Sequence, residues 1–401
     1  MYQFINEGSV TSPKGFKAAG IFCGIKKRKK DLALIVSDKL CNAAAVYTLN
    51  KVKAAPLLVS KEITDKDIQV KAVLINSGNA NACTGEDGFM DAKFTQEYCA
   101  DKLNVSPENV LISSTGVIGV KLPVQKVISG IDQIINVLSE KGGIDAAEAI
   151  MTTDTKIKSF AVKVRLSNGE TTIGAICKGS GMIMPNMATM LAFITTDAQI
   201  QKPLLKKLLV NSVNISFNKI SVDGETSTND MVVLLSNGLS GVEVIEGSSD
   251  EKLFQKALNA ISIEMAKSIV ADGEGATKLI TINVTGADTQ EDADLVGKSL
   301  ANSNLLKTAL YGNDANWGRI MSAAGMSGAN FDPAKVSISF DDHEVLLPHF
   351  QVMLNEEIAY KILSKKEYSI NVNLNGGDFS STWWTCDFSE EYVKINANYR
   401  T

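Results

Sequence analysis

Histidine is nearly absent from this chain of 401 residues, which contains only His343 and His349. A serine or cysteine nucleophile normally needs a base beside it, and histidine most often supplies that base. Both histidines lie in one short stretch near Pro348, with no catalytic motif around them. A conventional serine or cysteine triad is therefore not indicated, and any acyl-transfer chemistry needs its base from another group.

Closely spaced cysteine pairs are also missing. The six cysteines are scattered along the chain and form no CxxC pair. This pattern favours neither a disulfide framework nor a zinc site, so we expect reduced thiols and no metal. Cys83, in a loop rich in polar residues, and Cys177, beside Lys178, stay open as alternative nucleophiles.

Long apolar runs and a strong net charge are absent as well. No stretch of about 18 apolar residues occurs, and the first residues do not resemble a signal peptide, so we expect a cytoplasmic protein without a membrane partner. The net charge of −5 argues against nucleic acid as a partner. The one basic run, residues 26–30, lies between apolar segments and predicts a solvated hairpin tip. Neither a GxGxxG sequence after a strand nor a Walker A sequence is present, so nucleotide binding has no support.

The remaining pattern alternates short apolar strands with amphipathic helices. It predicts an α+β protein with two mixed α/β lobes that meet near residues 188 and 189. The last ten residues, 392–401, are expected to form an apolar strand that docks on the protein. The other expected strands are 16–25, 32–37, 43–49, 72–76, 110–113, 160–166, 171–177, 190–195, 231–236 and 279–284; the expected helices are 88–103, 123–140, 145–151, 203–213 and 251–270.

Two polar loops follow predicted strands, where binding groups are often found. Residues 76–82, Asn-Ser-Gly-Asn-Ala-Asn-Ala, either approach a ligand or form an asparagine-rich turn. In the second loop, the Thr115 hydroxyl and the Gly116 N–H are two donors of the kind that stabilise an oxyanion, although a simple Thr-Gly turn explains them too.

Further polar segments leave similar alternatives. Asp154 either caps a turn or contacts a substrate, and residues 221–230 either bind a cation or bridge core elements. Glu274 lies between two glycines, so backbone or ligand can come close to its carboxylate, but a plain helix-to-strand turn accounts for it equally well.

Residues 178–198 are the most informative segment, reading Lys-Gly-Ser-Gly-Met-Ile-Met-Pro-Asn-Met-Ala-Thr-Met-Leu-Ala-Phe-Ile-Thr-Thr-Asp-Ala. Cleavage between Ala188 and Thr189 would place a free α-amine beside the Thr189 hydroxyl. Such a pair contains both a nucleophile and its base, and an α-amine titrates near pH 7.7–8.0. The alternative is a Gly/Pro turn that enters a buried strand.

This segment also carries a resemblance to a known family. The chain resembles the bifunctional acetyltransferases of arginine biosynthesis, the glutamate N-acetyltransferase or ornithine acetyltransferase family. The matching stretches run through both halves of the chain in order: 76–85, 113–119, 151–155, 178–198, 218–230, 272–277, 312–325 and 396–401.

The resemblance implies a self-processing enzyme with an Ntn-hydrolase-like acetyltransferase/aminopeptidase-type fold. Cleavage at Ala188-Thr189 would give an α chain (1–188) and a β chain (189–401), expected to assemble as α2β2. The nucleophile would be Thr189, with Thr115 and Gly116 as the oxyanion hole. The implied substrate-contacting residues are Thr152, Lys178, Thr189, Glu274, Asn396 and Thr401.

The implied reaction moves the acetyl group of N2-acetyl-L-ornithine to L-glutamate through an acetyl-Thr189 ester. No metal or organic cofactor is needed, and acetyl-CoA is a further co-substrate in some members. The rival enzyme interpretation is a self-processing amidase or aminopeptidase that transfers the acyl group to water. A ligand-binding or scaffold protein with an uncleaved chain is the non-enzymatic alternative.

Overall fold

The computed structural model describes residues 1–184 and 190–398, which fold as two compact units. The first unit comprises residues 1–179, 190–218 and 226–265, and the second comprises residues 180–184, 219–225 and 266–398. Helix α6 (Ser249–Ala271) crosses from the first unit to the second. The chain thus changes unit several times, including at the glycine-rich segment that follows Lys178.

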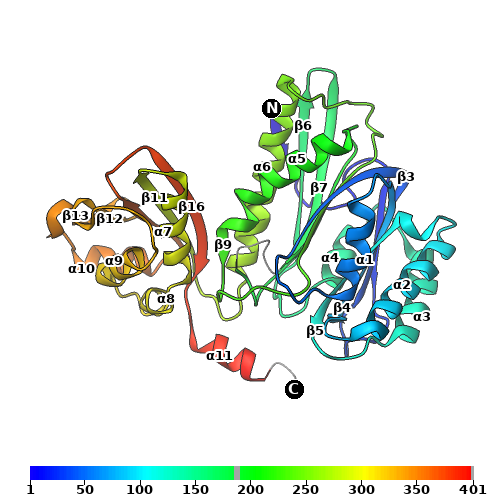
Figure 1. Cartoon of the computed structure of the whole chain (residues 1–401), viewed down its shortest axis with the longest axis horizontal. Coiled ribbons are helices and arrows are strands. Elements are labelled where there is room, and N and C mark those ends of the chain that lie inside the picture. The colour runs from blue at the N-terminus through cyan, green and yellow to red at the C-terminus, as the bar shows by residue number, and fades with distance from the viewer. Residues whose placement is uncertain (185–189, 399–401) are drawn as a thin grey trace. The chain divides into compact units, whose positions relative to one another are not determined.

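The first unit is built on a nine-stranded mixed sheet whose strands run in the order β1-β6-β7-β8-β10-β3-β4-β5, with β2 also paired to β3 (Figure 1). The strands are β1 (Tyr2–Phe4), β2 (Phe16–Ile21), β3 (Leu32–Tyr47), β4 (Val70–Asn79), β5 (Val110–Val117), β6 (Lys158–Leu166), β7 (Gly169–Lys178), β8 (Leu191–Thr196) and β10 (Met231–Ser236). The helices are α1 (Ala55–Thr64), α2 (Gly85–Lys102), α3 (Val124–Ile134), α4 (Gly143–Ala149) and α5 (Lys202–Asn214), with short 3-10 turns at Pro107–Asn109, Ile135–Val137 and Phe217–Lys219.

Successive apolar residues of β3 point to opposite faces of this sheet, and each face packs against different helices. On β3, Leu32 and Leu34 pack in one core cluster with α2 and α3, while Ala33 and Ile35 pack in another with α4. Because successive side chains of a strand point to opposite faces, an uninterrupted apolar run is what a strand covered on both sides requires. The core therefore lies on both faces of the sheet.

The long strand β3 joins two parts of this sheet. Its first half pairs with β2 and β4, and its second half pairs with β10. The register shifts between Val36 and Cys41, where the exposed residues 38–40 interrupt the apolar pattern. We expected two strands here, 32–37 and 43–49, but the irregularity bends one strand without ending it.

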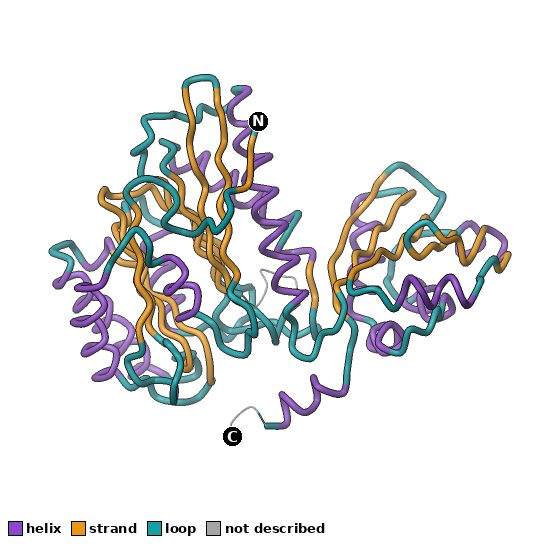
Figure 2. The backbone as a smooth tube through the Cα atoms, turned by 180° about the vertical axis from the view of Figure 1, so that it is seen from behind, coloured by secondary structure: helices purple, strands orange, loops and turns teal. Residues whose placement is uncertain are grey.

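The second unit has a seven-stranded sheet in the order β14-β13-β12-β15-β11-β16-β9, with helices α7 to α10 packed against it, while helix α11 extends away from it (Figure 2). Ile280, Ile282 and Val284 of β11 contribute to the buried cluster, while the alternate Asn283 joins its neighbour Asn371 by a side-chain hydrogen bond of 2.9 Å. The strands are β9 (Ile220–Ser221), β11 (Leu279–Ala287), β12 (Ser337–Phe340), β13 (His343–Leu347), β14 (Gln351–Val352), β15 (Glu367–Asn373) and β16 (Phe379–Cys386). The helices are α7 (Gln290–Asn302), α8 (Asn304–Tyr311), α9 (Trp317–Gly325), α10 (Glu356–Leu363) and α11 (Glu390–Ala397), with 3-10 turns at Pro333–Lys335 and Pro348–Phe350.

The α+β class with two mixed lobes is confirmed, and most expected elements form within a few residues of their expected bounds. The C-terminal expectation is wrong, because residues 390–397 form helix α11 and not a strand. Two acidic residues in the first turn and Lys394 in the last suit the helix dipole, which favours the helix. The expected boundary between residues 188 and 189 is a proposed cleavage site, and it stays a prediction.

Candidate active site

Thr115 and Gly116 lie at the carboxyl end of β5, which runs parallel to β4 (Figure 1). Gly116 has a φ of 136° and lies opposite Gly78. A Cβ at Gly116 would come within 3.0 Å of backbone atoms of Gly78 and Asn79, so only glycine fits. The Thr115 side chain is buried, and its hydroxyl lies 3.4 Å from the Lys178 ammonium.

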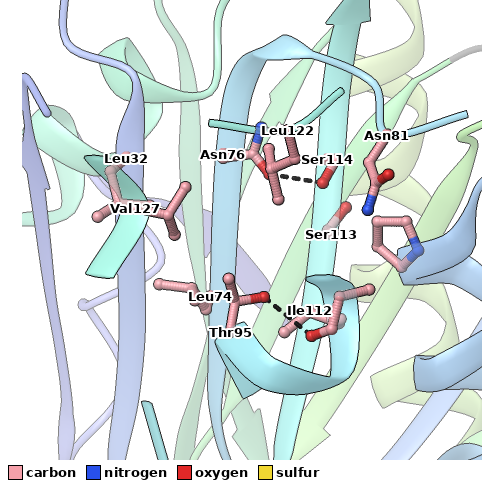
Figure 3. Close-up of a pocket in the computed structure, with 12 residues that line it drawn as sticks. Leu32, Leu74, Asn76, Asn81, Thr95, Ile112, Ser113, Ser114, Leu122 and Val127 are labelled. Carbon is pink, nitrogen blue, oxygen red and sulfur yellow. Dashed lines mark hydrogen bonds between the residues drawn. The ribbon is translucent and has the colours of Figure 1, made fainter. Parts of the chain in front are cut away.

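A small cavity of about 10 Å³ lies beneath this strand end, among β4, β5 and the helices that cover them (Figure 3). That space matches a single water molecule. The Ser114 hydroxyl donates to Asn76 Oδ1 at 2.5 Å. Within the described part of the chain, the Ser113 hydroxyl that also lines the cavity has no hydrogen-bond partner.

The asparagine-rich loop after β4 uses its side chains to fold its own backbone. Asn76 Nδ2 donates to the Asn79 carbonyl at 2.9 Å, and Asn79 Nδ2 donates to the Val120 carbonyl at 3.0 Å. Asn81 Nδ2 donates to the Gly88 carbonyl at 2.8 Å. This favours the turn interpretation of residues 76–82 and explains how the loop braces the strand ends beside Gly116.

Lys178 is the last residue of β7 and is only 5% exposed. It lies opposite Leu191, the first residue of β8. Thr115 and Lys178, two residues of the sequence-predicted site, are 63 positions apart in the sequence, and the fold brings them together from two strands. The arrangement places a buried cation beside one of the two expected oxyanion donors.

Thr152 is attached to the same region through Asp154. The Asp154 Oδ2 accepts the Thr152 N–H at 3.0 Å, while its Oδ1 accepts the Gly179 N–H at 2.7 Å and the Lys158 ammonium at 2.8 Å. Burial opposes ionisation of this carboxyl, but Lys178 and Lys158 outweigh it and hold its pKa well below the usual range. Asp154 is therefore a buried carboxylate at physiological pH.

Lys26 departs from the solvated hairpin tip that its basic run predicts. The hairpin itself forms, and Lys27, Arg28 and Lys29 are exposed, but Lys26 is half-buried. Its ammonium donates to the Met151 carbonyl at 2.6 Å, next to Thr152. Burial lowers the pKa of Lys26 to about 8.

Glu274 and Asn396 belong to the second unit, where Asn396 Nδ2 donates to Glu274 Oε2 at 2.8 Å. Glu274 is 7% exposed, and its N–H donates to the Ser180 carbonyl at 3.0 Å. A Cβ at Gly181 would collide with the Glu274 carboxylate, so the glycine lets this carboxylate lie against the backbone. These two expected substrate-contacting residues are therefore neighbours.

Sequence reasoning missed the role of Asp223. Its carboxylate accepts the N–H groups of Met182 at 2.6 Å and Ile183 at 2.8 Å, and the Val222 N–H donates to the Ile183 carbonyl. Asp223 therefore holds the glycine-rich segment just ahead of residue 185. No local signal predicts this, because the partners are about 40 residues apart in the chain. The finding favours the structural interpretation of the polar loop at 221–230.

Cys177 and His343 gain little support from the structure as an alternative nucleophile and base. Cys177 is fully buried, and this burial raises the pKa of its thiol to about 12, far from what a thiolate nucleophile needs. His343 lies on β13 of the second unit, where its Nε2 atom accepts a hydrogen bond from the Asn355 N–H. Ala188, Thr189 and Thr401, the remaining site predictions, lie outside the described residues.

The described residues contain neither a metal-binding cluster nor a membrane-spanning helix. Over residues 1–184 and 190–398, no group of three or more His, Cys, Asp or Glu side chains is arranged to hold a metal ion. Within the same residues, no helix combines the length and the apolar character that crossing a membrane demands.

Comparison with known proteins gives consistent matches. The ArgJ family model matches residues 17–401. The arginine biosynthesis bifunctional protein ArgJ of Caldanaerobacter subterraneus subsp. tengcongensis is 49% identical, over 99% of this chain and 100% of the relative. Arginine biosynthesis bifunctional protein ArgJ 1 of Clostridium acetobutylicum is 50% identical, over 99% of this chain and 98% of the relative. A solved chain of ornithine acetyltransferase complexed with ornithine, from Mycobacterium tuberculosis, is 36% identical and covers 46% of this chain and 99% of its own, with a TM-score of 0.43.

Proposed function

Because the chain belongs to the ArgJ family, we propose that it is an arginine-biosynthesis acetyltransferase that moves the acetyl group of N2-acetyl-L-ornithine to L-glutamate. Its relatives at 49% and 50% identity are named as bifunctional proteins of that pathway. The observation that carries the proposal is the buried pair of Lys178 and Thr115, 3.4 Å apart at the ends of two strands. It supplies a cation and a hydroxyl donor at one place.

We propose that the chain matures by cleaving itself between Ala188 and Thr189. The Thr189 hydroxyl attacks the Ala188 carbonyl, and the acyl group of the α chain moves from nitrogen to oxygen. This shift breaks the peptide bond and frees the Thr189 α-amine, and water then hydrolyses the ester to give the Ala188 carboxylate and the Thr189 hydroxyl. The products are an α chain of 1–188 and a β chain of 189–401, which we expect to assemble as α2β2.

Acetyl transfer then follows a ping-pong course. The Thr189 amine accepts the hydroxyl proton as the oxygen attacks the acetyl carbonyl of N2-acetyl-L-ornithine. The Thr115 hydroxyl and the Gly116 N–H donate to the oxyanion, a stabilisation worth about 3–4 kcal/mol for one donor elsewhere. The amine returns the proton to the departing ornithine nitrogen, which leaves an acetyl-Thr189 ester. The amine of glutamate attacks this ester and regenerates the hydroxyl.

Substrate recognition is proposed to use charge. Lys178 suits a substrate carboxylate and Glu274 suits the ornithine ammonium, with Thr152, Asn396 and Thr401 as further contacts. The burial of Lys178, Thr115 and Glu274 supports such roles, because charged contacts are stronger away from water. A dry site also protects the ester from hydrolysis. The chemistry needs no metal or organic cofactor, and the word bifunctional in the relatives' names supports acetyl-CoA as a second acetyl donor.

Intact-mass spectrometry tests the nucleophile. Freshly purified wild-type protein should give two fragments that meet between Ala188 and Thr189. The Thr189→Ala variant should give a single 43.0 kDa chain without transferase activity. A single wild-type chain that still transfers acetyl groups would rule out the terminal amine as the base.

The acceptor of the acyl group distinguishes a transferase from an amidase or aminopeptidase. A transferase should release ornithine in a sustained manner only when glutamate is present, because the acetyl ester then has an acceptor. An amidase or aminopeptidase should release ornithine equally well without glutamate, because water accepts the acyl group.

A further inference from the structure

We propose that Asp154 is a positioning residue of the active site, which holds Thr152 and the end of strand β7 in place and supplies a counter-charge to Lys178. This inference rests on the proposed function in that Thr152 and Lys178 are taken to contact the substrate. It concerns a residue that has no assigned role in that reaction, and it stands on the geometry of the first unit.

One carboxylate joins three chain segments. Asp154 accepts the Thr152 N–H with one oxygen, and with the other it accepts both the Gly179 N–H and the Lys158 ammonium. The side chains of Asp154 and Lys158 are 0% and 2% exposed. Lys158 lies on β6 opposite Cys177 of β7, so this ion pair lies next to the strand end that carries Lys178.

Thr152 is held from both sides. Asp154 binds its N–H, and Lys26 binds the carbonyl of the preceding Met151 at 2.6 Å. The two contacts hold the carbonyl and the N–H of one peptide group, the one that joins Met151 to Thr152, and so restrict the backbone that carries the Thr152 side chain. A residue that contacts substrate gains from such support, because displacement by about 1 Å can cost about 100-fold in rate.

The charges around Lys178 give Asp154 an electrostatic role as well. Among the described residues, Asp154, Lys26 and Asp230 interact electrostatically with Lys178, and Lys158 interacts with Asp154. Burial raises the pKa of Asp230 well above its usual value, whereas the neighbouring lysines lower that of Asp154. Asp154 therefore carries negative charge beside Lys178 under conditions in which Asp230 is protonated.

Asp197 provides a matched control. It is also a buried carboxylate of the first unit, and it accepts three hydrogen bonds: from the Thr171 hydroxyl, the Thr172 N–H and the Lys14 N–H. It acts on the beginning of β7, whereas Asp154 acts on its end. Asp154→Asn and Asp197→Asn therefore remove the same charge and disturb a similar set of bonds at opposite ends of one strand.

The first measurement is the pH profile of kcat/KM for N2-acetyl-L-ornithine, from roughly pH 6 to pH 10. In Asp154→Asn, Lys178 loses a counter-charge while the Lys158 cation remains, so the pKa of Lys178 should fall. The alkaline limb should move down by about one pH unit or more, with at least about a tenfold loss at pH 8. Asp197→Asn should keep the wild-type profile, even if it is less stable.

Amide hydrogen exchange supplies a readout that needs no activity. Exchange should become faster at both Thr152 and Gly179 in Asp154→Asn, and near residues 171–172 in Asp197→Asn. If Asp154→Asn fails to fold, Lys158→Gln serves instead. That variant removes a like charge near Lys178, so the alkaline limb should move to higher pH.

These measurements distinguish failure of the proposed role of Asp154 from failure of the proposed function. An unshifted alkaline limb, or a shift shared equally by Asp197→Asn, overturns the role of Asp154, as does unchanged exchange at Thr152 and Gly179. A wild-type protein without acetyl transfer overturns the proposed function instead. In that case the exchange at Thr152 and Gly179 still decides whether Asp154 holds these segments.

Discussion

At the scale of single residues, neighbouring serines on β5 differ sharply in their surroundings. The Ser114 hydroxyl donates to Asn76 Oδ1, whereas the Ser113 hydroxyl faces a cavity of about 10 Å³ that fits a single water molecule. Both side chains are buried. Comparing the two serines therefore measures how much one buried hydrogen bond contributes to the free energy of unfolding, because the two residues are neighbours on the same strand.

We predict that Ser114→Ala lowers the free energy of unfolding by about 1–3 kcal/mol, because it leaves the buried Asn76 oxygen without its donor. Ser113→Ala should cost less than about 1 kcal/mol, because it removes a hydroxyl that has no protein partner among the described residues. Denaturant titration of both variants beside the wild type measures the difference. Equal losses would contradict the difference in hydrogen bonding between the two serines.

The residues that sequence could identify are those with local signals. Thr115 and Gly116 follow a strand, and Lys178 opens the glycine-rich segment, so pattern and resemblance single them out. Lys26 could not be separated from its basic run, because its partner Met151 is 125 residues away in the chain. Asp154 had two open interpretations, since only the fold brings the Gly179 N–H to its carboxylate.

At the scale of elements, the ends of β4 and β5 approach each other so closely that one glycine becomes obligatory. Gly116 and Gly119 both have positive φ, 136° and 77°. A Cβ at Gly116 would meet the backbone of Gly78 and Asn79, while a Cβ at Gly119 would meet nothing within 4 Å. Both positions therefore have a backbone conformation that would strain a larger residue, but only Gly116 also lacks space for a side chain.

We expect Gly119→Ala to destabilise the protein by about 1–2 kcal/mol, the usual cost of a side chain in the left-handed region. Gly116→Ala should cost clearly more, and it should lower kcat by about 100-fold or more because it displaces one oxyanion donor. Thermal unfolding and initial rates give both quantities. Similar rates for the two variants would place the oxyanion site away from the end of β5.

Most elements were predictable because their apolar periodicity is regular. Strand β10 forms at the expected residues, and α5 and α6 differ from expectation by one or two residues at each end. Strand β3 was divided in two because exposed residues interrupt its pattern at 38–40, and sequence does not show that paired neighbours carry the strand through. Helix α11 was assigned to a strand because it is short and buries none of its side chains.

At the scale of the whole molecule, the proposed cleavage site divides a single sheet. Strands β1 to β7 precede residue 188, while β8 and β10 follow it and lie between β7 and β3. The two expected chains, 1–188 and 189–401, would therefore share one set of backbone hydrogen bonds. Cleavage would not release them, because each chain completes the sheet of the other.

We predict that residues 1–188 expressed alone form insoluble or aggregated protein, because β7 and β3 then expose unpaired edges. Coexpression with residues 189–401 should give a soluble complex with equal amounts of both chains, which native mass spectrometry detects. The uncut Thr189→Ala chain is the control for solubility. A soluble, folded 1–188 fragment would contradict the shared sheet.

The same strand order has a consequence for synthesis on the ribosome. The second half of β3 pairs with β10, which emerges roughly 190 residues later, so at about 5–20 residues per second that edge waits about 10–40 s for its neighbour. During this interval the nascent chain exposes an unpaired strand edge, which is prone to aggregation. Strand β10 must also be translated before the sheet around β8 can close. The proposed cleavage beside β8 would then follow the translation of β10.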